Sequence, residues 1–139
     1  MQKLEDVVIH MLKKFENIDF LNTISPLDYE SFLRQHPLRP FDEEVISYLN
    51  ALSKTLNQDT RIREYPDIST FAFFCRRANI IQLKSKYGSD DSIRLGRGVV
   101  FHIAPSNVAI NFAFSLVASL LAGNSNIVRV PSKRLEQID

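Results

Sequence analysis

The residues best suited to chemistry lie in a turn that follows a short apolar run, GVVFH at residues 98–102. This turn contains Pro105, Ser106 and Asn107. The Asn107 side chain could donate an amide N–H to a developing oxyanion. Its alternative role is the N-cap of the helix that follows, and the spacing alone favours the cap. The turn contains no glycine, so it is not the GxGxxG phosphate cradle of ordinary dinucleotide-binding folds.

Basic side chains gather at the end of a second short apolar run, residues 127–130. Arg129, Lys133 and Arg134 are positively charged, and the nearest acidic residue is Glu136. An acidic residue at this place would select the free ribose of NAD, whereas basic residues accommodate a 2′-phosphate. If a nucleotide binds here, the pattern therefore favours NADP. The alternative is a solvated, charged strand end.

Four other polar side chains have a structural interpretation beside a chemical one. His102 could be a catalytic base, but a single histidine in a core strand is more often a satisfied structural group. Cys75 lies among apolar residues at helical spacing, so we expect a buried, inert thiol rather than a nucleophile. Ser115 and Ser119 continue a four-residue spacing that starts at Asn107, and we expect both to bond back to the preceding turn.

These residues are positioned by a predicted strand, helix and strand. Residues 98–102 and 127–130 are short, apolar and β-branched, whereas residues 108–122 are long enough for a buried helix. Two strands joined by a helix form a parallel βαβ unit, in which ligands gather at the carboxyl ends of the strands. A lone unit has too few strands for a finished parallel sheet, so we expect the start of a larger, truncated α/β domain.

The preceding chain is predicted to be mainly helical. Apolar residues at helical spacing predict one helix near residues 4–15, one that starts after Asp42 and carries an apolar stripe to Leu56, and one at about residues 70–87. We therefore divide the chain into a helical segment, residues 1–94, and the start of an NADP-binding α/β domain, residues 95–139.

Composition excludes several classes of protein. The 139 residues include 17 Lys and Arg against 16 Asp and Glu, without a basic stripe, so nucleic acid is not expected as a partner. One cysteine excludes an internal disulfide and suits a reducing, cytoplasmic location. Residues 99–128 carry no charge, but turns leave only 15 of them in the helix, too few to span a membrane.

The central stretch closely resembles the fatty acyl-CoA reductase family, which supplies long-chain aldehyde to bacterial luciferase and belongs to the aldehyde dehydrogenase superfamily. The resemblance covers about residues 40–133, and its most specific parts are GRGVVFHIAPSNVAINFAFSLVASLLAGNSNIVRVPSK and YPDISTFAFFCRRANIIQLK. It implies an aldehyde dehydrogenase-like Rossmann-type fold. It also implies that a cysteine attacks an acyl-CoA thioester and that NADPH then reduces the acyl-enzyme to an aldehyde.

The resemblance also implies roles for individual residues. Asn107 matches the asparagine of a Pro-x-Asn motif that helps to form the oxyanion hole. Counting forward from the AGN turn places Arg129 at the ribose-contacting lysine, whereas counting back from Pro131 places Val130 there. Arg129 is the preferred match, because a basic group suits that contact, and Lys133 lies where NAD-using relatives carry glutamate. The expected cofactor-binding residues are therefore Pro105, Ser106, Arg129 and Lys133.

The family's catalytic cysteine lies downstream of these residues, and Cys75 does not match it. The chain is therefore expected to be inactive alone, with acyl-CoA as the substrate of the full protein. An acyl-transfer protein and a second copy of the chain are candidate partners. An alternative is a non-catalytic module that pairs through its helices or open strand edges.

Overall fold

The computed structural model describes residues 34–88, 92–105 and 107–130. The chain divides into two compact units, residues 1–35 and 36–139, and nearly all described residues belong to the second. The helix predicted at residues 4–15 lies outside the described residues. The predicted boundary near residue 95 stays a prediction.

The first described helix, α3 (Glu43–Gln58), begins where the sequence indicates. The Asp42 carboxylate accepts a hydrogen bond from the Glu44 backbone N–H at 2.9 Å, which confirms Asp42 as the N-cap. Glu43 and Glu44 lie at the positive end of the helix dipole. The apolar face, with Ile46 and Leu49 fully buried, packs toward the core.

The single helix predicted over residues 70–87 is wrong. After a short 3-10 helix, η2 (Thr60–Glu64), the structure has two helices, α4 (Pro66–Phe74) and α5 (Arg77–Tyr87), separated at Cys75 and Arg76. Arg76 has an extended backbone, with ψ of 136°. Asn79 Nδ2 donates to the Phe74 carbonyl oxygen at 2.9 Å and so stabilises the end of α4.

The predicted βαβ unit is confirmed. Strand β1 (Val99–Ile103) leads through helix α6 (Asn111–Leu121) to strand β2 (Ser125–Arg129), and the two strands are parallel. The described residues thus form a mixed α/β structure with a two-stranded sheet. Helix α6 begins three residues later than the predicted start at Val108.

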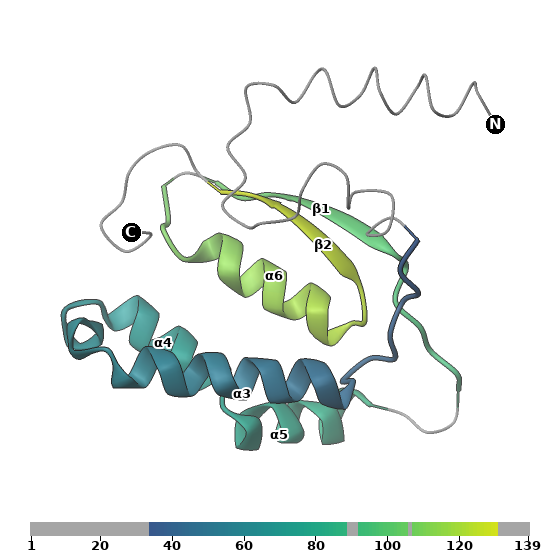
Figure 1. Cartoon of the computed structure of the whole chain (residues 1–139), viewed down its shortest axis with the longest axis horizontal. Helices are drawn as coiled ribbons and strands as arrows, with labels where there is room; N and C mark the ends of the chain where they lie inside the picture. The colour runs from purple at the N-terminus through teal and green to yellow at the C-terminus, as the bar shows by residue number, and fades with distance from the viewer. Residues whose placement is uncertain (1–33, 89–91, 106, 131–139) are drawn as a thin grey trace. The chain divides into compact units, whose positions relative to one another are not determined.

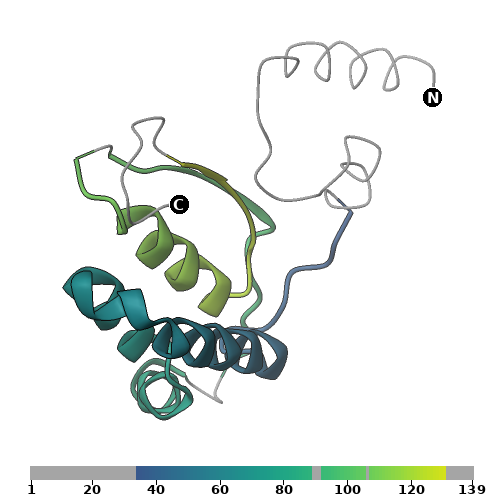
Figure 2. The same cartoon turned by 60° about the vertical axis from the view of Figure 1, so that its left-hand side comes forward.

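Helix α6 lies between the sheet and the helices α3 to α5 (Figures 1 and 2). Its buried residues Ala113, Val117 and Leu121 share a core with side chains of α3, α4 and α5. Phe71 of α4 packs edge-on against Phe114 of α6, with 5.1 Å between ring centroids. The sheet, α6 and the other helices therefore form successive layers around one core.

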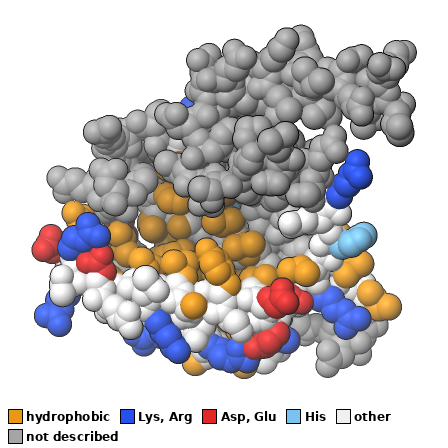
Figure 3. Space-filling model, viewed as in Figure 1, with side chains coloured by type: hydrophobic (Ala, Val, Ile, Leu, Met, Phe, Trp, Pro, Cys, Tyr) orange, Lys and Arg blue, Asp and Glu red, His pale blue; other side chains and the backbone are white. Residues whose placement is uncertain are grey.

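Charged side chains border the lower rim of the face seen in Figure 3, and apolar side chains occupy the band above them. Within the described ranges, no helix combines the length and the apolar character needed to cross a bilayer.

Candidate functional site

The strand register brings the carboxyl ends of the two strands to the same edge of the sheet. Ile103, the last residue of β1, pairs with Arg129, the last residue of β2. Pro105 therefore follows β1 directly beside the end of β2. Both Pro105 and Arg129 are exposed. Ser106 and Lys133 lie outside the described residues, so their predicted contacts with a cofactor stay predictions.

Asn107 is not the cap of α6. The N-cap of that helix is Ile110, which makes no side-chain capping bond, and residues 107–110 form turns. The predicted cap is wrong because the chain completes a turn before α6 begins at Asn111. The Asn107 side chain is exposed and makes no hydrogen bond to another described residue. Its amide is therefore available to a ligand at the strand ends, which is what an oxyanion donor requires.

His102 is held on both ring nitrogens between β2 and α6. Its Nε2 lies 2.8 Å from Asn126 Oδ1, and its Nδ1 lies 2.7 Å from Ser115 Oγ. The orientation of the Asn126 amide follows from its other bond, since Nδ2 donates to the Asn124 carbonyl oxygen at 2.8 Å. The Nε2 atom therefore donates to Asn126, and in the neutral ring Nδ1 accepts from the Ser115 hydroxyl.

This arrangement confirms the structural interpretation of His102, which is 9% exposed. Both ring nitrogens are satisfied, so the imidazole joins β1, α6 and β2. The expectation that Ser115 bonds back to the preceding turn is wrong, because its hydroxyl reaches across to the strand instead.

A second polar network fixes the turn between α6 and β2. Asn124 Oδ1 accepts from the Arg97 backbone N–H at 2.6 Å, and Asn124 Nδ2 donates to Ser119 Oγ at 3.1 Å. The predicted hydrogen bond from the Ser119 hydroxyl to the preceding turn is also absent among the described residues; the hydroxyl oxygen accepts from Asn124. Sequence reasoning did not assign roles to Asn124 and Asn126. The available signal was two closely spaced asparagines at the start of a half-buried strand.

Cys75 is fully buried in the core, as predicted. Burial raises the pKa of its thiol to about 11. A cysteine nucleophile must be both ionised and accessible. Cys75 therefore cannot perform covalent chemistry in this fold.

The residues at the strand ends fit a phosphorylated cofactor in their charge. The Arg129 side chain is exposed and forms no ion pair with another described residue. No carboxylate among the described residues therefore neutralises the guanidinium group that a phosphate would contact. Over the described part of the chain, no three His, Cys, Asp or Glu side chains gather in a way that could hold a metal ion.

The described residues form an α/β protein with two parallel strands, and ligands of such folds bind at the carboxyl ends of the strands. The family follows from sequence comparison. Residues 41–136 match the sequence model of the family described as Acyl-CoA reductase (LuxC), and the chain belongs to this family. No curated protein and no solved structure matches the chain.

Proposed function

We propose that the protein is the N-terminal portion of an NADPH-dependent reductase that converts fatty acyl-CoA to aldehyde through a cysteine acyl-enzyme. The family match over residues 41–136 is the observation that carries this proposal. The paired ends of β1 and β2 support it, since the turn with the exposed Asn107 follows β1 at the edge where the exposed Arg129 ends β2. An aldehyde dehydrogenase-like Rossmann arrangement for the whole domain is part of the same proposal.

Asn107 serves as an oxyanion donor in this proposal. When a thiolate attacks the acyl carbonyl, a carbon–sulfur bond forms and negative charge develops on the carbonyl oxygen. The Asn107 amide N–H stabilises that charge, and the CoA thiolate then leaves and takes a proton. Such donors act most strongly on charge that develops during the reaction.

The cofactor side of the site consists of Pro105, Ser106, Arg129 and Lys133. The two cations bind the 2′-phosphate, and the turn residues line the adjacent edge of the sheet. When bound, NADPH supplies the hydride that reduces the acyl group. The chain's own contribution is to bind and orient it.

The nucleophile in this proposal is a cysteine outside these 139 residues. Cys75 is the sole cysteine in the sequence, and its thiol is buried and neutral at physiological pH. The 139-residue chain alone is therefore not expected to reduce acyl-CoA.

The experiment uses a protein that carries this chain together with the cysteine-bearing part of the family domain. Asn107→Ala should lower kcat by about 10²-fold to 10³-fold, as expected for the loss of one oxyanion donor. Asn111→Ala is the matched control, since Asn111 is an exposed amide at the start of α6. Equal kcat values for the two variants would exclude Asn107 from the oxyanion hole.

The second candidate is a non-catalytic interaction module. The side chains of Val99, Phe101 and Ile103 are exposed and alternate along β1 with half-buried Val100 and buried His102, which contacts α6. In this case the chain would pair through these exposed side chains with a second copy or an acyl-transfer protein. Light scattering at high protein concentration tests self-association, and a monomer would count against pairing between copies.

A further inference from the structure

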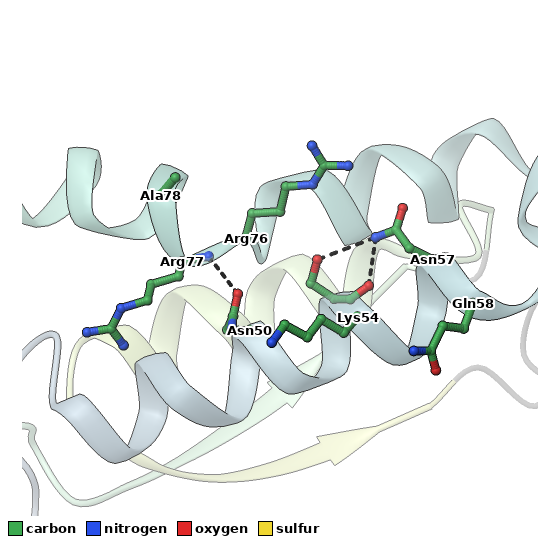
Figure 4. Close-up of a pocket in the computed structure, with 8 residues that line it drawn as sticks. Asn50, Lys54, Asn57, Gln58, Arg76, Arg77 and Ala78 are labelled. Carbon is green, nitrogen blue, oxygen red and sulfur yellow. Dashed lines mark hydrogen bonds between the residues drawn. The ribbon is translucent and has the colours of Figure 1, made fainter.

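A groove lies between the second half of α3 and the junction of α4 with α5. It has a volume of about 480 Å³, within the range of pockets that hold small molecules. Its lining consists of cationic and amide side chains with one serine and one alanine: Asn50, Ser53, Lys54, Asn57, Gln58, Arg76, Arg77 and Ala78. Figure 4 shows these side chains, with α3 on one side and Arg76, Arg77 and Ala78 on the other.

The groove carries uncompensated positive charge. None of the lining residues is acidic, and three of them are Lys or Arg. Arg77 forms an ion pair with Glu43, and the hydrogen bond from Arg77 lowers the pKa of that carboxyl group. Lys54 and Arg76 form no ion pair with a described residue, so no carboxylate among those residues neutralises either charge.

The walls of the groove are held in place before any ligand binds. The Ser53 hydroxyl donates to the Ala72 carbonyl oxygen at 2.6 Å, which joins α3 to α4. Asn50 Oδ1 accepts from the Arg77 backbone N–H at 3.2 Å, which joins α3 to α5. The Arg76 guanidinium lies 4.9 Å from the centroid of the Phe73 ring, and this contact restrains it.

Two further features favour an anion. The groove includes the first residues of α5, an 11-residue helix whose N-cap residue makes no side-chain cap and whose Arg77 N–H is bonded to Asn50. The positive end of the helix dipole therefore adds to the two cations. Asn50 uses its Oδ1 atom for Arg77, so its Nδ2 group remains a donor for a ligand.

We propose that this groove binds a phosphate monoester, and that its ligand is the 3′-phosphate of the CoA nucleotide. The choice of CoA rests on the proposed function. Of the two phosphate monoesters in that reaction, the one on NADPH is assigned to Arg129 and Lys133, which leaves the one on CoA. A long flexible arm separates the nucleotide from the thioester, so the groove can hold the nucleotide away from the reacting carbon.

The test measures binding of CoA, 3′-dephospho-CoA and inorganic phosphate to the full chain by NMR titration. CoA should bind about fivefold more tightly than 3′-dephospho-CoA and shift the amide signals of Arg76, Arg77 and Ala78. Inorganic phosphate should shift the same signals more weakly. Added salt should weaken the binding of CoA, because the cations are exposed.

Lys54→Ala and Arg76→Ala should each weaken CoA binding about threefold to tenfold and leave binding of 3′-dephospho-CoA unchanged. Lys86→Ala is the matched control, because Lys86 is an exposed lysine of α5 outside the groove. Retained CoA affinity in both groove variants would overturn the proposal. Equal affinity for CoA and 3′-dephospho-CoA, no binding of CoA, or a response to inorganic phosphate alone would also overturn it.

Failure of this inference is separable from failure of the proposed function. Arg129→Ala should not change CoA binding in the groove, since Arg129 ends β2 and does not line the groove. If the groove variants bind CoA normally while Arg129→Ala weakens NADPH binding, only the groove assignment fails. If the groove variants lose CoA while Arg129→Ala leaves NADPH binding unchanged, the cofactor assignment fails and the groove assignment stands.

Discussion

His102 illustrates how neighbours decide the role of a reactive side chain. An imidazole between a serine hydroxyl and an amide oxygen has the components of a nucleophile, a base and an orienting group. Here the histidine is buried between the sheet and α6, and both of its ring nitrogens are hydrogen-bonded to protein side chains. The same contacts that would orient a base therefore stabilise the joint between β1, α6 and β2.

His102→Ala should lower the free energy of unfolding by about 2–4 kcal/mol, because it removes a buried ring and leaves Asn126 Oδ1 without its donor. Ser115→Ala should cost about 1 kcal/mol, since Ser115 is exposed and water can replace its hydroxyl. Urea denaturation measures both values. A loss below about 0.5 kcal/mol for His102→Ala would contradict a structural role.

Cys75 makes the stability of the fold depend on pH in the alkaline range. Its thiol pKa is raised to about 11 by burial, from 9.0, so the unfolded chain loses this proton first. Between these two values the folded state binds more protons than the unfolded state, and stability falls as pH rises.

The expected loss from pH 9 to pH 11 is at most about 2–3 kcal/mol. Urea denaturation at several pH values in this range measures it. Cys75→Ala is the control, since it removes the thiol and should remove this part of the slope. A thiol that reacts with Ellman's reagent in the native protein as fast as in urea would show that Cys75 is accessible.

At the scale of elements, the turn from α6 to β2 depends on a glycine. Gly123 has a φ of 86°, and a methyl group there would overlap the carbonyl oxygen of Leu38. The Leu38 N–H in turn donates to the Gly123 carbonyl at 2.9 Å. The segment before α3 and the start of β2 are thus held together by backbone contacts that only glycine permits.

Gly123→Ala should lower the free energy of unfolding by about 3 kcal/mol, the sum of an unfavourable φ and the steric overlap. Gly98→Ala is the matched control. Gly98 also has a positive φ, 104°, but no atom lies within 4 Å of the added carbon, so its cost should be about 1–2 kcal/mol. Thermal unfolding of both variants measures the difference, and equal losses would contradict the close approach at Gly123.

Local patterns in the sequence predicted the elements whose signals are local. The Asp42 cap and the βαβ unit follow from residues within each element. The break between α4 and α5 does not, because no glycine or proline marks it. Asn50, 27 residues away on α3, caps the Arg77 N–H. The hydrogen bonds of His102 likewise join residues 13 and 24 positions apart. Such tertiary contacts leave no periodic signal.

The sequence predicted where in the fold the candidate site would lie, but it did not predict how the side chains there are arranged. The two parallel strands end together at Ile103 and Arg129, so the sequence alone located the edge of the sheet where the candidate site is proposed. The capping role of Asn107 was wrong because the length of the turn before α6 depends on packing of that helix.

At the scale of the whole molecule, the proposals place two anion sites on different layers. Arg129 at the end of the sheet is assigned to the cofactor, and the groove of Lys54 and Arg76 on the helices is assigned to CoA. Both sites are built from exposed cations without a carboxylate partner among the described residues. The buried side chains of α6 pack between the sheet and the other helices, so α6 would fix the distance between the two proposed sites.

The most direct test of the central claim is the affinity of the protein for NADPH and NADH, measured by fluorescence titration. NADPH should bind about tenfold more tightly, and Arg129→Ala should remove most of this preference while leaving NADH binding unchanged. Arg97→Ala is the control, since Arg97 is an exposed arginine at the opposite end of β1. Equal affinity for the two cofactors, or an unchanged preference in Arg129→Ala, would contradict a cofactor site at the strand ends.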